Sequence, residues 1–158
     1  MHPTRGPLGR LLLAMTALAA LGAAPAARAA GTVVLKGTMV TNCGVVVDDL
    51  NATVNLTGGS TNLNVATVGE KCNDKDGYTV TVTSANGGAL VNAAGTRAPY
   101  TASYSGVSGR SLATPLVLTR TKDQKSFVYR NFTVTLPPNA QLTAGSYVDT
   151  ITITLAAC

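Results

Sequence analysis

The sequence has no tryptophan and one histidine, and only 12% of its 158 residues are charged and 4% aromatic. Its apolar residues are mostly Ala, Val and Leu, and they are interleaved with Thr, Asn, Gly and Ser. Such a mixture is typical of half-buried β-strands joined by tight turns. The composition therefore excludes a coiled coil or another protein of long helices, and the length suits one domain.

The histidine, His2, belongs to a segment with the features of an export signal. Arg5 and Arg10 flank the start of an apolar run of about fourteen residues, and Ala27-Arg28-Ala29 offers small residues for signal-peptide cleavage. A membrane-spanning helix is the competing interpretation, but it needs ~20 residues. We therefore predict that residues 1–29 are a cleaved signal peptide.

Removal of this segment changes what charge and histidine imply. Three of the 12 Lys and Arg residues belong to the signal peptide. The mature chain therefore has nine Lys and Arg and seven Asp and Glu, which gives it a net charge of +2. These cations are scattered, and the stretch from Arg120 to Arg130 is best interpreted as a solvated loop, so we expect no nucleic-acid partner. Without histidine, the mature chain builds neither a Ser-His-Asp triad nor a His-ligated metal site.

The acidic residues offer no clear catalytic or metal site. Asp48 and Asp49 are adjacent, so on a strand their side chains point to opposite faces. Residues 73–77 are similar to part of a calcium loop, but Cys72 stands at the first ligand position and Thr83 at the last. We interpret residues 73–77 as a turn before a strand, and we expect no enzyme, no metal and no cofactor.

Alternation of apolar and polar residues predicts a series of β-strands. The clearest are residues 77–84 and 147–155, and weaker signals cover 33–41, 43–47, 52–56, 63–68, 98–104, 112–119 and 127–136. Pro115 cannot donate a hydrogen bond to a neighbouring strand, so its strand should lie at an edge or be interrupted. Short strands separated by turn signals, without helical patterns between them, predict an antiparallel β-sandwich of immunoglobulin size.

The three cysteines favour one disulfide. Cys43 and Cys72 occupy strand-like positions in an exported chain, which favours a structural bridge over a free or metal-binding pair. Closing a loop of about thirty residues stabilises the fold by roughly 3.6 kcal/mol on a chain-entropy estimate. Cys158 could pair with either of the others, cross-link to another molecule or stay free.

Four segments carry a resemblance to a known family. They are the alternating residues before Cys43, Glu70-Lys71-Cys72-Asn73, Gly77-Tyr78-Thr79-Val80 and, above all, the run from Leu142 to Thr154 with the sequence LTAGSYVDTITIT. The chain thereby resembles bacterial pilin subunits of the chaperone-usher pathway, nearest to the spore coat protein U-like, or archaic, group.

The resemblance implies an incomplete immunoglobulin-like sandwich, formed by residues 43–158, with an open groove in place of its last strand. The groove would border the core face of the strand that is last in this chain, which carries Ile151, Ile153 and Leu155. Residues 30–42 would be an N-terminal extension that fills the groove of the next subunit by β-strand addition. One face of this donor strand would carry Val33, Leu35, Gly37 and Met39.

The resemblance also implies partners and a function. The partners would be a periplasmic chaperone, an outer-membrane usher and neighbouring copies of this chain or of related subunits. The protein would be a structural subunit of a cell-surface pilus or coat fibre, secreted through the periplasm and used in adhesion or biofilm formation.

One alternative remains open on the residues alone. The alternation in Val33–Thr41 also suits the first strand of the chain's own sheet, because a donated strand and an internal strand have the same pattern. The protein would then be a self-complete secreted β-sandwich that binds a carbohydrate or protein ligand. The lack of tryptophan and the scarcity of aromatic residues argue against a sugar-stacking site.

Overall fold

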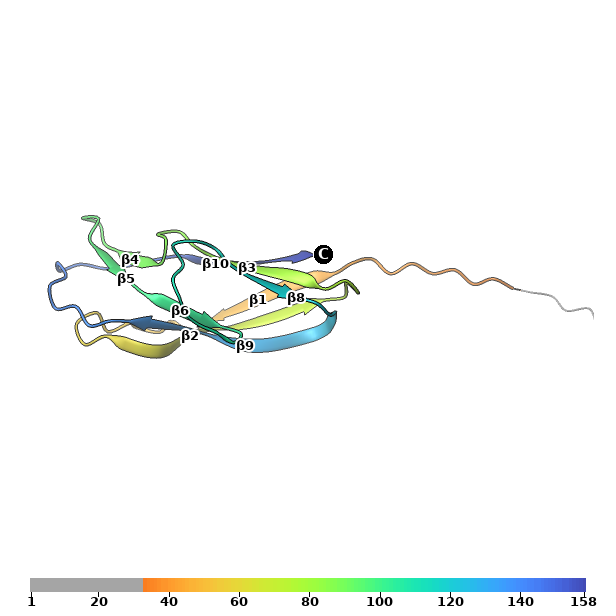
Figure 1. The fold of residues 1–158 in the computed structure, drawn as a ribbon, viewed down its shortest axis with the longest axis horizontal. Coiled ribbons are helices and arrows are strands. Elements are labelled where there is room, and N and C mark those ends of the chain that lie inside the picture. Colours follow the sequence, from red (N-terminus) through yellow and green to blue (C-terminus); the bar gives the residue numbers. More distant parts are fainter. Residues whose placement is uncertain (1–32) are drawn as a thin grey trace, which may run out of the picture. The chain divides into compact units, whose positions relative to one another are not determined.

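The structure is a computed structural model that describes residues 33–158 (Figure 1). The signal peptide predicted at residues 1–29 lies outside the described residues, and so do residues 30–32 of the predicted extension. The chain divides into two units between Gly37 and Thr38. The first unit carries no secondary structure in its described part, Val33 to Gly37, and the second holds every described strand.

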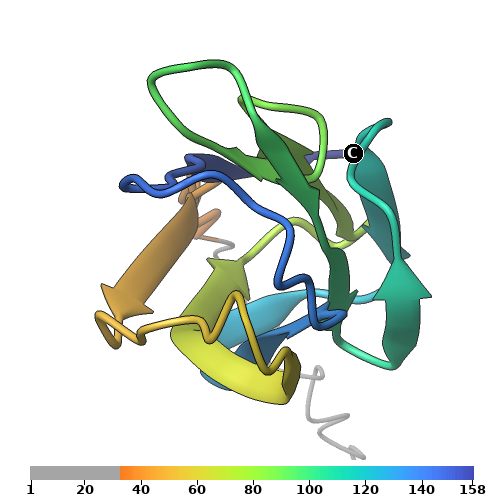
Figure 2. The same ribbon diagram turned by 90° about the vertical axis from the view of Figure 1, so that its left-hand side faces the viewer.

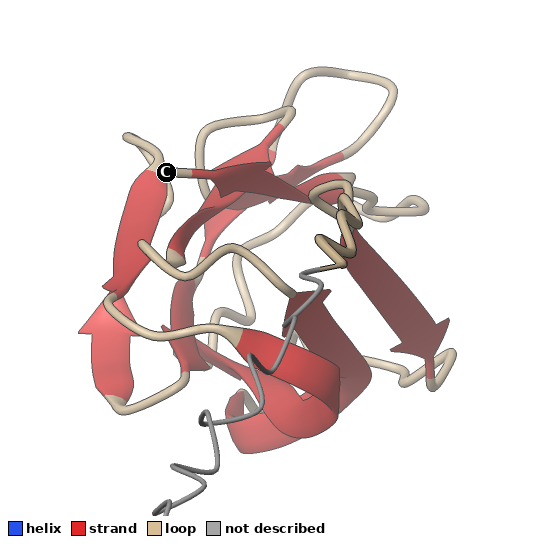
Figure 3. Cartoon of the chain, turned by 90° about the vertical axis from the view of Figure 1, so that its right-hand side faces the viewer, coloured by secondary structure: helices blue, strands red, loops and turns tan. Residues whose placement is uncertain are grey.

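Ten β-strands and no helix occur in residues 33–158 (Figure 3), so no helix there is long and apolar enough to cross a membrane. The strands are β1 (Cys43–Asp49), β2 (Ser60–Cys72), β3 (Tyr78–Ser84), β4 (Ala89–Val91), β5 (Arg97–Pro99), β6 (Thr101–Tyr104), β7 (Val107–Arg110), β8 (Leu116–Arg120), β9 (Gln124–Leu136) and β10 (Ile151–Ala157).

Two antiparallel sheets form the two layers of a sandwich. One sheet has the order β1-β2-β9-β6-β7 and the other the order β10-β3-β8, while β4 and β5 form a small third sheet. In Figure 1, β3 and β10 lie in the upper layer and β2 and β9 in the lower one. The predicted fold class, an all-β antiparallel immunoglobulin-like sandwich, is confirmed.

Alternation along the strands builds the core between the layers. In β3, Tyr78, Val80 and Val82 are buried, whereas the threonines between them are partly exposed. Strand β9 presents Phe132 and Val134 to the same interior. Because side chains of a strand point to opposite faces in turn, each strand supplies one apolar face to the core.

A disulfide joins Cys43, the first residue of β1, to Cys72, the last residue of β2. The two cysteines are opposite each other in the antiparallel register, so the bridge ties the edge strand β1 to its neighbour. This is the pair that the sequence favours, and Cys158 is free and exposed.

Two weaker strand predictions are wrong. Residues 33–41 form no strand, so the interpretation of this segment as the first strand of its own sheet is also wrong. Residues 52–56 form none either, because the Asn55 side chain accepts a hydrogen bond from Gly58 (2.8 Å) and closes a turn there.

Other boundaries differ by a few residues. The strand predicted at 147–155 begins only at Ile151, and the one at 98–104 is split at Tyr100 into β5 and β6. The prediction for Pro115 is confirmed, since β8 begins directly after it and lies at the edge of its sheet.

Candidate functional site: an open groove between two sheet edges

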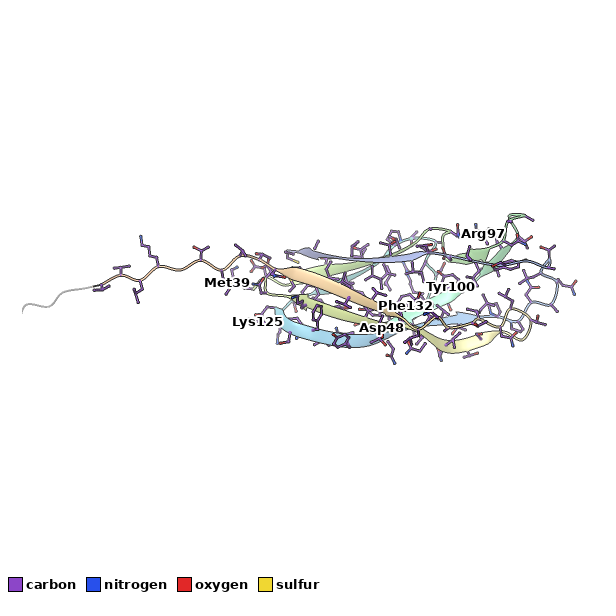
Figure 4. All side chains as sticks on the ribbon, turned by 180° about the vertical axis from the view of Figure 1, so that it is seen from behind. Met39, Asp48, Arg97, Tyr100, Lys125 and Phe132 are labelled. Carbon is purple, nitrogen blue, oxygen red and sulfur yellow. A yellow bond between two sulfur atoms is a disulfide. The ribbon has the colours of Figure 1, made fainter. Side chains whose placement is uncertain are left out.

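Strands β1 and β10 lie next to each other on one side of the sandwich, and each is the edge of its own sheet (Figure 4). Within residues 33–158, β1 pairs with β2 alone and β10 with β3 alone. Each strand therefore has one edge whose backbone N–H and C=O groups are unpaired, which is a template for a further strand. Figure 2 shows β1 in orange and β10 in dark blue on the same side, opposite β7 and β8.

Three adjoining cavities make a groove on this side. The first, of about 220 Å³, lies between Val47 on β1 and Ile153 on β10. The second, of about 120 Å³, is lined by Val54, and the third, of about 320 Å³, reaches Leu56. All three share Asp149 as a lining residue, so they follow one another along a single groove.

The hydrophobic core forms the floor of the groove. Phe132 lines the first cavity, and Val134 and Tyr100 line the second, although each of these side chains is at most 6% exposed. The rim is more open, since Val47 is 49% exposed. A sandwich with a strand in this position would cover that apolar surface, so the groove has the chemistry of a binding site for an extended apolar segment.

The structure brings two of the three predicted groove residues into this site. Ile151 and Ile153 are partly buried on β10 and line the groove. Leu155 has the same orientation and packs against the core, but it lines none of the three cavities.

The predicted donor residues all lie in the segment without secondary structure. Val33, Leu35 and Met39 have 84%, 91% and 86% of their surface exposed, and Gly37 is exposed as well. Figure 4 labels Met39 in this segment. This segment thus presents large apolar side chains to solvent.

The segment with the strongest family resemblance turns the chain into β10. Tyr147 donates its hydroxyl hydrogen to the carbonyl oxygen of Thr143, four residues earlier (2.8 Å). A tyrosine that bonds back in this way at the entry to a strand is a feature of immunoglobulin-like sandwiches. The bond holds the loop that leads into the groove edge.

Asp149 then fixes the start of β10. Its carboxylate accepts hydrogen bonds from the hydroxyls of Ser84 and Tyr100, both at 2.6 Å, and from the backbone N–H of Asn86 at 3.0 Å. Burial and the hydrogen bond to Asp149 raise the pKa of Tyr100, which keeps its hydroxyl protonated as a donor. Asp149 therefore ties the edge strand to the core, and it is a site residue that sequence analysis missed.

A buried charged cluster was missed as well. Glu70 on β2 is completely buried and accepts hydrogen bonds from Tyr78 (3.0 Å), from Nε and Nη2 of Arg120 (3.1 and 2.8 Å) and from Tyr104. Nη1 of Arg130 lies 3.3 Å from Oε2 of the same carboxylate. Burial by itself would raise the pKa of Glu70, but these hydrogen bonds and the charge of Arg120 outweigh it and lower the pKa.

The cluster corrects the interpretation of Arg120–Arg130 as a solvated loop. Arg120 lies on β8 and Arg130 on β9, and their side chains are only 19% and 28% exposed. The signal was present in β2, where Glu70 stands between Val68 and Cys72 in the inward-facing phase of the alternation. A carboxylate in that phase needs buried cationic or hydroxyl partners.

The acidic residues that the sequence offered as candidates do not gather into a site of their own, although Asp49 lines the first cavity of the groove. Asp48 and Asp49 are exposed on β1, and the Asp74 side chain accepts a hydrogen bond from the Asp76 backbone N–H (3.0 Å), which stabilises a turn before β3. In the part of the chain that the structure describes, no group of three or more His, Cys, Asp or Glu side chains could hold a metal ion.

No protein-family model matches the chain, and no curated protein matches it in sequence. Among solved structures, the chain is similar to HdaB, the minor tip subunit of the Hda pilus of E. coli, with 14% identity and a TM-score of 0.39 over 71% of this chain and 79% of that one. It is also similar to self-complemented MyfA, the major subunit of Myf fimbriae from Yersinia enterocolitica, with 15% identity and a TM-score of 0.40 over 70% and 94%. A second MyfA structure, in complex with galactose, gives 13% identity and a TM-score of 0.41 over the same shares.

Proposed function

We propose that the protein is a structural subunit of a cell-surface fibre, and that its groove receives an extended strand from a neighbouring subunit. The observation that carries this proposal is the groove itself, which lies between two unpaired strand edges and has the core as its floor. A donated strand would pair with both edges and cover the apolar floor at the same time.

Residues 30–42 are the segment we propose as donor. Fully extended, these residues span about 43 Å. Burying Val33, Leu35 and Met39 contributes roughly 5 to 8 kcal/mol, and eight or so new backbone hydrogen bonds contribute about 1 kcal/mol each. Ordering the nine residues 33–41 of this segment costs roughly 9 to 18 kcal/mol, so donation becomes favourable only if the strand both pairs and buries its apolar face.

The same proposal includes the wider assembly. An unfilled groove exposes core surface, so we propose that a periplasmic chaperone fills it first and that an outer-membrane usher exchanges it for the next subunit's extension. We place the chain nearest to the spore coat protein U-like group of such subunits. The fibre would lie at the cell surface after secretion through the periplasm, with a role in adhesion or biofilm formation.

A peptide experiment tests this function. A synthetic peptide of residues 30–42 is added to a chain that lacks these residues, and the melting temperature is followed by circular dichroism. We expect the peptide to raise the melting temperature, and a peptide with Leu35→Asp and Met39→Asp to leave it unchanged. If both peptides act alike, or neither acts, the groove does not receive this strand.

A further inference from the structure

A second pocket lies on the side away from the groove, where β8 leads into β9. It has a volume of about 340 Å³ and is lined by residues of both strands and of the turn between them, together with Tyr78: these are Thr119, Arg120, Thr121, Lys122, Asp123, Gln124 and Arg130. Figure 3 shows the end of the sandwich at which β8 leads into β9. None of these residues lines the groove between β1 and β10.

The charges around this pocket do not cancel. Arg120, Arg130, Lys122 and Lys125 carry four positive charges, and Glu70 and Asp123 carry two negative ones, which leaves a net charge of +2. Asp123 is already paired with Lys125 at 3.1 Å. Glu70 is shared by Arg120 and Arg130, so the surplus is one charge of this arginine pair and the charge of Lys122.

Arg130 is the residue whose hydrogen-bonding capacity is left over. A carboxylate has about four lone-pair sites, and Glu70 already accepts two bonds from Arg120 and one each from Tyr78 and Tyr104. Nη1 of Arg130 is buried 3.3 Å from Glu70, yet it has no hydrogen-bond partner among residues 33–158. The Arg130 side chain is also 28% exposed and lines the pocket, so the exposed part of its planar guanidinium is available to an anion and suits a carboxylate.

We propose that this pocket binds an acidic sugar, a hexuronate unit, whose carboxylate lies against Arg130 and Lys122. The same pocket is also lined by three residues with neutral hydrogen-bonding side chains, Thr119, Thr121 and Gln124. A ring with several hydroxyls uses such groups, whereas a bare carboxylate does not need them. The pocket volume falls within the range of small-molecule sites.

The test is calorimetric titration of the mature chain, in the oligomeric form in which it is purified, with glucuronate. Glucose tests the role of charge, and acetate tests the role of the ring. We expect glucuronate to bind once per chain, at least about tenfold more tightly than glucose or acetate, because a charge-assisted hydrogen bond is worth a tenfold change or more. Added salt should weaken the binding.

Two substitutions locate the site. Arg130→Gln and Lys122→Gln should each weaken glucuronate binding about tenfold, while Arg110→Gln, which removes an exposed cation on β7, should leave it unchanged. Lys122 is exposed, so its substitution keeps the test valid even if Arg130→Gln disturbs the fold. Equal binding of glucuronate and glucose, equal binding of glucuronate and acetate, or full binding by Lys122→Gln would each overturn the proposal.

Discussion

At the scale of single residues, Glu70 connects the two layers of the sandwich. It lies on β2 of one sheet, and its partners Tyr78 and Arg120 lie on the other sheet, on β3 and β8. Glu70→Gln would leave two partly buried arginines without a counter-charge. We expect a loss of about 3 to 5 kcal/mol in unfolding free energy, measured by urea denaturation.

The exposed Asp48 provides the control for this substitution. Asp48→Asn also removes one carboxylate charge, and it should change stability by less than about 0.5 kcal/mol. A Glu70→Gln variant as stable as Asp48→Asn would show that the cluster does not hold the layers together.

Glu70 also determines an acid dependence of stability. Because its pKa is lower in the folded chain than the ordinary value of 4.5, its stabilisation is complete above about pH 4.5 and is lost as the pH falls through the folded pKa. Urea denaturation between pH 6 and pH 2, chosen as about two units either side of that value, should show this loss. Glu70→Gln should flatten this part of the curve, and an unchanged slope would assign the acid sensitivity to other carboxylates.

Gly77, in the Gly-Tyr part of the family resemblance, has a position that excludes a side chain. Its φ is +95°, and a Cβ built there would lie 1.9 Å from the carbonyl oxygen of Arg120. Gly77→Ala should therefore lower stability by about 2 kcal/mol or more. Gly95→Ala is a matched control, since its φ is +80° with open space around the Cβ, and it should cost only about 1 kcal/mol. Equal losses in thermal unfolding would contradict the role of the close contact.

At the scale of elements, the start of β10 depends on Asp149. Asp149→Ala removes the acceptor for Ser84, Tyr100 and Asn86, and it leaves the buried Tyr100 hydroxyl without this partner. We expect a stability loss of about 2 kcal/mol and faster amide hydrogen exchange in Ile151–Ala157, measured by mass spectrometry. Asp48→Ala is the control, and unchanged exchange in β10 would mean that other contacts define the groove edge.

Local patterns were enough to predict most of the longer strands, but the short strands β4 and β7 lie where no strand was expected. The alternation in Tyr78–Ser84 predicts β3 almost to the residue, because each inward position is apolar and each outward one is threonine. The same reasoning failed at residues 52–56, where the Asn55 side chain competes for backbone hydrogen bonds. It also failed at 147–150, where the Asp149 side chain accepts the Thr150 N–H and Val148 forms only an isolated bridge with Val91. Side-chain bonds to nearby backbone therefore account for these errors.

At the scale of the whole molecule, the groove depends on pairings that no local pattern contains. Which edges stay unpaired is decided by the approach of β1 and β10, which are separated by most of the chain. Alternation alone could not distinguish a donated strand from an internal one at Val33–Thr41, and only the resemblance pointed to donation. The Glu70 cluster depends likewise on β2, β8 and β9 meeting in space, so its arginines look like surface residues in the sequence.

The measurement that tests the central claim most directly compares two secreted versions of the mature chain, both with Cys158→Ser. One is residues 30–158, and the other carries residues 30–42 behind the C-terminus through a short flexible linker. The second should be a monomer with a clearly higher melting temperature, and Leu35→Asp in the moved segment should abolish the gain. A stable monomer of the first version, with no gain on moving the segment, would contradict the account of an open groove that this strand fills.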